Sequence, residues 1–265
     1  MPLRSGVEHE VTLVIASDVP EAVAERLADL TDLAGYRLLA PQTHAIRDVH
    51  FDTPDRALEA RDLALRLREI DGQRWISVKG PARPLPGGGV ARPEFERPWS
   101  PEAVVAALDE LARAGVTLPA VGPAPAGLGA REGMLAAGLE VIQDRETRRV
   151  VRAVVTEKGE PSLAQLAVDA VVFHLRGVDV RHHEVEIEAA SEAGREVLPL
   201  LAGTLLRQFG PALRVGLQSK LAIGRALECL LRQGVLWGVL DRRGNLTPAG
   251  YDRLVACGPI PHNRG

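Results

Sequence analysis

The sequence predicts an α+β fold in which helices flank a β-barrel with a polar interior. Several short segments alternate apolar and charged residues with the two-residue period of a β-strand. The charged faces are acidic in some of these segments and basic in others. One charged face is ordinary on an antiparallel sheet with a solvated side, but many such faces of both signs favour a barrel with a charged lumen.

Two of these segments are acidic. In residues 7–15, Glu8, Glu10 and Thr12 share one face, and in residues 183–188 three glutamates share one face. Carboxylates two residues apart on a strand lie roughly 6.5–7 Å from each other. Two such pairs facing each other would offer hard oxygen ligands to Mg²⁺ or Mn²⁺. The alternative is a solvated outer face, which is the commoner use of alternating glutamate.

Other predicted strands are basic. Arginines alternate with apolar residues in residues 63–69 and recur in residues 147–152, while lysines end residues 74–80 and open a late apolar helix. A lumen with these side chains would hold a polyanion, because a guanidinium group matches two phosphate oxygens at once. The candidates for contacts with such an anion are Arg66, Arg68, Lys79, Arg148, Arg152 and Lys220. Arg149 has the opposite parity to Arg148, so it is expected on the other face of its strand.

The remaining elements follow from turn and capping residues. Ser-Pro-Glu at 100–102 and Ser191 are typical helix starts, and the Pro/Gly-rich stretches predict loops. The sequence therefore predicts helices over 21–33, 101–113, 191–208 and 218–233, a strand over 41–52, loops over 84–89 and 119–133, four strands within 139–188, and a turn with a short helix over 241–250.

The ordered motifs resemble those of the CYTH superfamily, the triphosphate tunnel metalloenzymes. Glu8, Glu10 and Thr12 stand in its Glu-x-Glu-x-Lys signature, and Phe51-Asp52-Thr53-Pro54 is similar to its next turn. The Leu-Arg-x-Arg run at 65–68, Lys79-Gly80 and the Arg-x-Glu-x-Glu strand at 92–96 follow in the family's order. The late acidic strand and the closing Ser219-Lys220 complete a resemblance that spans residues 7–231.

This resemblance implies an antiparallel, eight-stranded closed β-barrel and metal-dependent hydrolysis of a triphosphate by water attack on the terminal phosphate. Inorganic tripolyphosphate is the expected substrate, and thiamine triphosphate or a nucleoside triphosphate are the other candidates. The implied cofactor is Mg²⁺ or Mn²⁺, held by Glu8, Glu10, Glu186, Glu188 and Asp169. Asp169 has the alternatives of supporting a basic residue or forming a surface ion pair. Glu94 and Glu96 would position the attacking water or a second metal.

One position departs from the family pattern, because Thr12 replaces the signature lysine. Threonine keeps a hydroxyl group on that face but loses the charge, which puts the activity in question more than the fold. Two alternatives therefore stay open. One is an adenylyl cyclase of the family's class IV type, and the other is a non-catalytic module that binds polyphosphate or nucleotide.

Length, net charge and composition limit the classes of function that the sequence allows. The chain has 265 residues, a net charge of −3 and no run of eighteen apolar residues, so neither DNA binding nor a membrane span is expected. Two cysteines without metal-ligand spacing fit a cytoplasmic protein, and the abundance of Ala, Arg, Gly and Pro suggests a bacterial source. We expect a CYTH domain over 1–233 and an extension of unknown role over 234–265; a homodimer is an open alternative. Histidine ligation by His182 is disfavoured beside so many oxygen ligands.

Overall fold

The computed structural model describes residues 6–86, 88–118, 129–157 and 159–257. Within these residues the order of paired strands closes on itself, because β9 pairs with both β4 and β10. The eight strands of this ring, in order β10-β11-β1-β8-β6-β5-β4-β9, form a closed antiparallel β-barrel, which confirms the predicted fold class. The bounds of the eight strands are β1 Gly6–Ile15, β4 Gln42–Asp52, β5 Ala64–Ile70, β6 Gln73–Lys79, β8 Val90–Pro98, β9 Glu140–Thr156, β10 Gly159–Leu175 and β11 Val178–Ala189.

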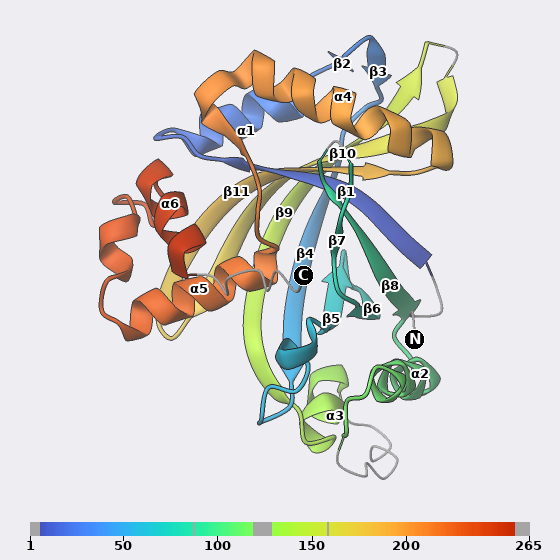
Figure 1. Cartoon of the computed structure of the whole chain (residues 1–265), viewed down its shortest axis with the longest axis vertical. Coiled ribbons are helices and arrows are strands. Elements are labelled where there is room, and N and C mark those ends of the chain that lie inside the picture. Colours follow the sequence, from blue (N-terminus) through green and yellow to red (C-terminus); the bar gives the residue numbers. More distant parts are fainter. Residues whose placement is uncertain (1–5, 87, 119–128, 158, 258–265) are drawn as a thin grey trace. The chain divides into compact units, whose positions relative to one another are not determined.

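The chain divides into two compact units, which we call the first and the second unit. The first unit comprises Met1–Glu10 and His44–Glu146, and the second comprises Val11–Thr43 and Thr147–Gly265. Strands β1, β4 and β9, which are labelled in Figure 1, contribute residues to both units. Each unit has a hydrophobic core of its own.

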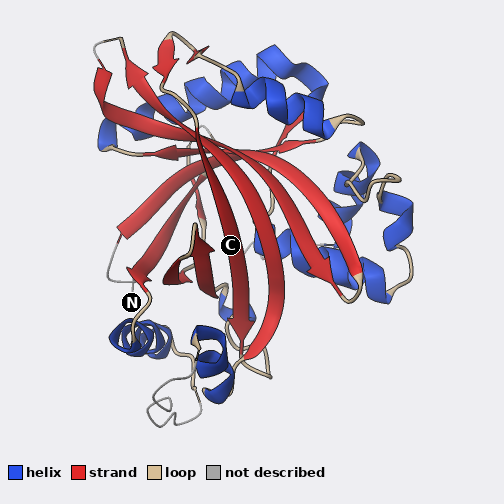
Figure 2. Ribbon diagram, turned by 180° about the vertical axis from the view of Figure 1, so that it is seen from behind, coloured by secondary structure: helices blue, strands red, loops and turns tan. Residues whose placement is uncertain are grey.

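The first unit is a meander of β5, β6 and β8 with helices packed on its apolar face. The β5–β6 hairpin turns at Asp71 and Gly72, whose φ angles of 49° and 84° suit a two-residue turn. Leu65 and Val78 are paired and buried, whereas the alternate positions of β5 are arginines. The remaining elements are β7 (Arg83–Pro84), η1 (Glu59–Arg61), α2 (Pro101–Arg113) and α3 (Ala130–Ala136). Side chains of α2 and α3 join the strands in one core, and Figure 2 separates these helices from the strands by colour.

The second unit is built on the long β10–β11 hairpin. One face of β11 is apolar and packs, through residues such as Val185 and Ile187, against α1 and α4, while the glutamates occupy the other face. Phe173 belongs to a second core with α5 and α6. The further elements are α1 (Pro20–Ala28), β2 (Asp32–Leu33), β3 (Tyr36–Leu38), α4 (Glu192–Phe209), η2 (Gly210–Ala212), β12 (Leu213–Val215), α5 (Lys220–Arg232), η3 (Leu236–Val239) and α6 (Pro248–Cys257).

Serine caps explain where three of the helices begin. The hydroxyl oxygens of Ser100, Ser191 and Ser219 accept the backbone N–H of the residue three positions later, at 3.1, 3.1 and 3.3 Å. Such a cap satisfies one of the N–H groups that the first turn leaves without a helical partner. The predicted helices over 101–113, 191–208 and 218–233 are thereby confirmed to within two residues at each end.

Three sequence predictions were wrong. The first helix ends at Ala28 rather than at residue 33, because a turn with left-handed Ala34 and Gly35 pairs β2 with β3. Residues 139–188 form three strands rather than four, since β9 and β10 are each 17 residues long without a break. Of the loop predicted over 119–133, residues 119–128 lie outside the described residues, and residues from Ala130 onward are helical.

Candidate functional site

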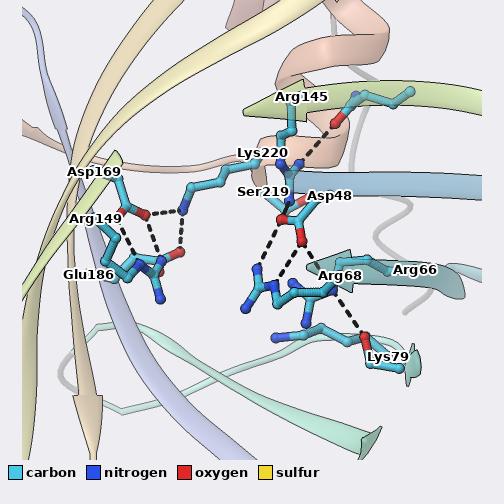
Figure 3. A network of polar contacts seen from close by, with 12 residues as sticks. Asp48, Arg66, Arg68, Lys79, Arg145, Arg149, Asp169, Glu186, Ser219 and Lys220 are labelled. Carbon is cyan, nitrogen blue, oxygen red and sulfur yellow. Dashed lines mark hydrogen bonds and ion pairs between the residues drawn. The ribbon is translucent and has the colours of Figure 1, made fainter. Parts of the chain in front are cut away.

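A cluster of arginines surrounds one buried carboxylate in the first unit. Asp48 on β4 lies opposite Arg68 on β5, and the guanidinium of Arg68 donates to both of its oxygens, at 2.7 and 2.9 Å. Arg145 on β9 donates to Asp48 Oδ2 at 3.0 Å, and Arg66 Nε lies 3.8 Å from Oδ1. We call these four residues the arginine cluster (Figure 3). Among these four residues, one carboxylate faces three guanidinium groups.

Asp48 stays ionised in this setting. Burial favours its neutral form, but the charges of Arg68, Arg66 and Arg145 outweigh burial and hold the pKa of Asp48 well below its ordinary value. The side chain of Asp48 is 1 % exposed, so its contacts with the arginines are screened little by water. The ionised carboxylate therefore acts as a buried counter-ion that offsets the repulsion among the three guanidinium groups.

Predicted residues of both signs meet beside the arginine cluster. Arg66 Nη2 lies 3.4 Å from a carboxylate oxygen of Glu94 and 3.2 Å from one of Glu96, and its Nε donates to the Ser77 hydroxyl at 3.0 Å. Lys79 Nζ lies 2.5 Å from Glu8 and 3.4 Å from Glu94. Strand register produces this meeting, since Lys79 pairs with Glu94 and Ser77 with Glu96. Burial raises the pKa of Glu94, with Lys79 and Arg66 opposing it and Glu8 and Glu96 adding to it.

His50 adds a neutral group to the same region. It lies opposite Arg66 in the β4–β5 ladder, is 4 % exposed, and has no hydrogen-bond partner at Nδ1. Burial, followed by the charge of Arg145, lowers the pKa of His50 well below its ordinary value. The imidazole is therefore uncharged at neutral pH and adds no further positive charge to the arginines.

A second cluster, in the second unit, gathers three carboxylates around two cations. Asp169 on β10 lies directly opposite Glu184 on β11, and Glu186 follows on the same face of β11. One oxygen of each carboxylate lies within 4.8 Å of the others. We call Asp169, Glu184 and Glu186 the carboxylate cluster. Like charges opposite each other in a ladder are destabilising, so this arrangement requires cations.

Arg149 and Lys220 supply these cations. Arg149 donates to both oxygens of Asp169, at 2.7 and 2.6 Å, and also contacts Glu186. Lys220 Nζ lies 3.0 Å from Asp169 and 2.6 Å from Glu186, and it contacts Glu184 as well; Figure 3 shows the contacts with Asp169 and Glu186. Three negative and two positive charges leave the group with a net charge of −1.

In this group the pKa of Asp169 is lowered and the pKa of Lys220 is raised, so both shifts favour the charged form. Burial opposes ionisation of Asp169, but Arg149 and then Lys220 outweigh burial and lower its pKa. Burial likewise opposes the charge of Lys220, and the carboxylates of Glu184, Glu186 and Asp169 overcome it and raise its pKa. Asp169 and Lys220 are therefore ionised and paired, which is the condition under which buried charges are tolerated.

The carboxylate cluster fits a hard divalent cation. Carboxylate oxygens are the ligands that Mg²⁺ and Mn²⁺ prefer, and among the described residues these three make the group close enough to share an ion. Of the five predicted ligands, Asp169 and Glu186 belong to the cluster. Glu8 and Glu10 belong to the first unit, where Glu8 contacts Lys79 and Glu10 lies opposite Val90, and in the second unit Glu188 lies opposite Gln165.

Two predicted phosphate contacts lie elsewhere. Arg148 is exposed, and it is Arg149, of the opposite parity, that reaches the carboxylate cluster. Arg152 is directed at the backbone, since its Nε donates to the Ala28 carbonyl at 2.7 Å and its Nη1 to the Leu39 carbonyl at 2.8 Å. These contacts tie β9 to the end of α1 and to the segment before β4.

Sequence reasoning missed several residues of both clusters. Glu184 was recognised in the acidic strand but was not among the predicted ligands, although it shares the parity of Glu186. The same signal was available on β9, where Arg145 and Arg149 stand four residues apart on one face. Asp48 was also missed, as were His50 beside the arginine cluster and the role of His182 beside the carboxylate cluster.

Thr12, the departure from the family signature, lies in the second unit beside Gly216. Its carbonyl accepts the Gly216 N–H at 2.8 Å, and a Cβ on Gly216 would lie 3.0 Å from the Thr12 methyl group. The threonine side chain thus fits closely against a residue that has none. Lys220, four residues after Gly216, supplies an ammonium group to the carboxylates of this unit.

Comparison with known proteins places the chain in a family. A model described as the CYTH domain matches residues 19–208, and the chain belongs to this family. The match ends before α5, so Lys220 and the C-terminal extension lie beyond it. No curated protein matches the chain.

A solved structure agrees with the fold. A protein from Hippeastrum, described as a candidate adenylyl cyclase with a dominant triphosphatase activity, is 20 % identical, with a TM-score of 0.52 over 83 % of this chain and 95 % of its own. A candidate adenylate cyclase from Bacillus halodurans is 18 % identical, with a TM-score of 0.49 over 82 % of this chain and 97 % of its own. At these identities the likeness concerns the fold alone. Among the described residues no helix is both long and apolar enough to cross a membrane.

Proposed function

We propose that this protein is a metal-dependent triphosphatase that releases the terminal phosphate of a triphosphate, with inorganic tripolyphosphate as its substrate. The observation that carries the proposal is the arginine cluster, in which three guanidinium groups share one carboxylate. A triphosphate presents several adjacent anionic oxygens, and Arg binds such oxygens in pairs. The family match supports the same class of reaction.

The residues beside the cluster suit the proton and charge requirements of this reaction. Arg66 and Arg68 would bind phosphoryl oxygens, and Lys79 would neutralise charge that develops as the bond to the leaving phosphate breaks. Glu94, whose pKa is raised, binds a proton more readily than an ordinary glutamate. A carboxylate with that property can orient a water molecule and accept its proton.

The proposed metal is Mg²⁺ or Mn²⁺, held by Asp169, Glu184 and Glu186. When bound, such an ion supplies positive charge that neutralises phosphoryl oxygens. Arg149 keeps two of these carboxylates oriented through its contacts with Asp169 and Glu186. Lys220 occupies the same carboxylates here, so its ammonium group would have to share them with the ion.

The experiment is the release of orthophosphate from tripolyphosphate by the purified chain, with Mg²⁺, with Mn²⁺ and with a chelator. We expect metal-dependent release that Arg66→Gln lowers by about 10²- to 10³-fold, as for loss of one group that stabilises developing charge. The matched control is Arg74→Gln, which alters an arginine of the neighbouring strand whose side chain is 52 % exposed and pairs with Glu69. This variant should stay within about twofold of the parent, because an exposed pair contributes little.

Two other outcomes would redirect the assignment. Release of pyrophosphate with a cyclic nucleotide from ATP would favour a cyclase, the other activity in the description of the Hippeastrum protein. Heat stabilisation by tripolyphosphate without any turnover would make the chain a binding module. Metal-dependent turnover would show that Thr12 is tolerated at the position of the family's lysine.

A further inference from the structure

A buried chain of three side chains connects the C-terminal extension to the carboxylate cluster. The Tyr251 hydroxyl on α6 lies 2.8 Å from Nδ1 of His182, and Nε2 of His182 lies 2.6 Å from a carboxylate oxygen of Glu184. His182 is fully buried, Tyr251 is 7 % exposed and Glu184 is 1 % exposed. Neither the metal nor the phosphate chemistry proposed above uses His182 or Tyr251.

For a neutral imidazole beside an ionised carboxylate, the hydrogen atoms of this chain have one consistent arrangement. An ionised carboxylate only accepts hydrogen bonds, so Nε2 of His182 donates to Glu184. In a neutral imidazole Nδ1 is then an acceptor, and the Tyr251 hydroxyl donates to it. Burial, followed by the charge of Glu184, raises the pKa of Tyr251, which keeps this hydroxyl protonated. The tyrosine therefore fixes the tautomer of the histidine, and the histidine holds one oxygen of Glu184.

The backbone of the extension is fixed at the same place. The N–H of Arg181 donates to the Gly244 carbonyl at 2.8 Å, and the N–H of Leu246 donates to the Arg181 carbonyl at 3.0 Å. The extension thus pairs with β11 one residue before His182. At the other end of the extension, the Leu254 carbonyl accepts a hydrogen bond from Gln218 Nε2 at 3.3 Å. Gln218 lies two residues before Lys220.

Apolar packing holds α6 in this position. Tyr251 and Leu254 lie in one buried core with Phe173 of β10 and Leu227 of α5. The ring of His182 lies between those of Phe173 and Tyr251, with ring centroids 6.2 and 5.6 Å away. An aromatic ring with neighbours on two sides and hydrogen bonds at both nitrogens has little freedom to rotate.

We propose that residues 234–257 are a positioning element of the carboxylate cluster, in which Tyr251 orients His182 and His182 orients Glu184 for a divalent cation. Partners of this kind, which hold a metal ligand from behind, are commonly worth 10- to 100-fold in metal affinity. The inference rests on the proposed use of the carboxylate cluster as a metal site, and it assigns a role to a segment that lies beyond the family match.

The test measures Mn²⁺ binding to the full chain by electron paramagnetic resonance of the free ion, without substrate. Tyr251→Phe removes one hydroxyl group and keeps the ring, and we expect the Kd for Mn²⁺ to rise about three- to tenfold. The matched control is Tyr36→Phe, since Tyr36 is the chain's other tyrosine and lies on β3 of the same unit. This control should bind Mn²⁺ like the parent.

A second pair of variants keeps the test independent of the folding of Tyr251→Phe. His182→Leu should raise the Kd about 10- to 100-fold. His182→Gln, whose amide can still donate toward Glu184, should recover most of this loss. A purely structural role would lower the melting temperature of both variants without separating their Mn²⁺ affinities.

The metal-free chain gives a further readout through the ¹⁵N shifts of the histidine rings. In the parent we expect one tautomer of His182, protonated at Nε2, and in Tyr251→Phe a mixture of the two. Parent-like Mn²⁺ binding by both Tyr251→Phe and His182→Leu would overturn the positioning role and leave the proposed function standing. Absence of Mn²⁺ binding by the parent would overturn the proposed metal site and, with it, this inference.

Discussion

The guanidinium of Arg68 and the carboxylate of Asp48 form a two-pronged pair, with distances of 2.7 and 2.9 Å, in a place that water hardly reaches. The same carboxylate also contacts Arg66 and Arg145. Removing its charge would leave three guanidinium groups close together without their counter-charge, and the loss of one partner in a buried pair is costly.

Asp48→Asn should therefore lower the free energy of unfolding by about 3–5 kcal/mol, measured by chemical denaturation in a buffer without phosphate. Tripolyphosphate should raise the melting temperature of this variant more than that of the parent, since the added anion replaces the lost charge. Asp144→Asn is the control, because Asp144 also takes a two-pronged contact, from an Arg47 whose side chain is 52 % exposed. A loss of less than about 1 kcal/mol is expected there. Equal losses in the two variants would contradict the role of burial.

Substitutions of the neighbouring Arg148 and Arg149 on β9 should differ sharply in their effect on turnover. Arg149→Gln removes the cation that holds Asp169 and Glu186, so we expect tripolyphosphate turnover per folded molecule to fall about 100-fold or more. Arg148→Gln changes an exposed side chain and should alter turnover by less than about twofold. Phosphate release by the two purified variants, with folding checked by circular dichroism, decides the matter. The reverse order would restore the assignment of Arg148 that was made from the sequence.

Two glycines of α4 should respond to alanine with opposite signs. A Cβ on Gly194 would lie 1.8 Å from the Leu163 carbonyl oxygen, so Gly194→Ala should destabilise by about 1–3 kcal/mol or more. A Cβ on Gly203 would meet only the far end of the Arg207 side chain, at 3.4 Å. Gly203→Ala should stabilise the fold by about 0.5–1 kcal/mol, the ordinary gain in a helix interior. Thermal melts of both variants test this, and a shift of the same sign in both would refute it.

Stability should fall in mild acid partly because of His50. Its pKa is lowered in the folded state, so between the ordinary value of 6.5 and the folded value the unfolded chain binds the proton more readily. The contribution of this residue is therefore complete above about pH 6.5 and is lost as the pH falls, by up to about 1.4 kcal/mol per pH unit.

The measurement is the free energy of unfolding between pH 7.5 and 5 for the parent and for His50→Gln. The variant should lose less stability over this interval than the parent. His44→Gln, which alters an imidazole on the same strand with 31 % of its side chain exposed, is the control. A parent-like slope for His50→Gln would contradict the assignment.

Strand periodicity was sufficient to predict the barrel and to bring some residues of each cluster together. The pairing of Lys79 with Glu94, for instance, follows once both strands and their polar faces are recognised. Asp48 and His50 were missed although they alternate along β4, because this strand carries polar residues on both faces and its sequence does not reveal which of them are buried.

Choosing between Arg148 and Arg149 required more than parity. Their strand is 17 residues long and belongs to both units, so its neighbours change along its length. Arg152 illustrates the same difficulty, since its partners are carbonyl groups of residues 28 and 39, more than a hundred positions away. Only the tertiary fold determines which face of such a strand receives a partner.

Lys220 has a consequence for how the protein acquires an ion. An ammonium group has three N–H bonds, and here three carboxylates surround it, a match that the flat guanidinium of arginine does not reproduce. The folded chain thus supplies, through Lys220, a cation of its own at this position, and the carboxylates can come together during folding without an ion from solution. A bound ion would share these carboxylates with the ammonium group, and acetylation of this one lysine would leave Arg149 to offset the charges of Asp169 and Glu186.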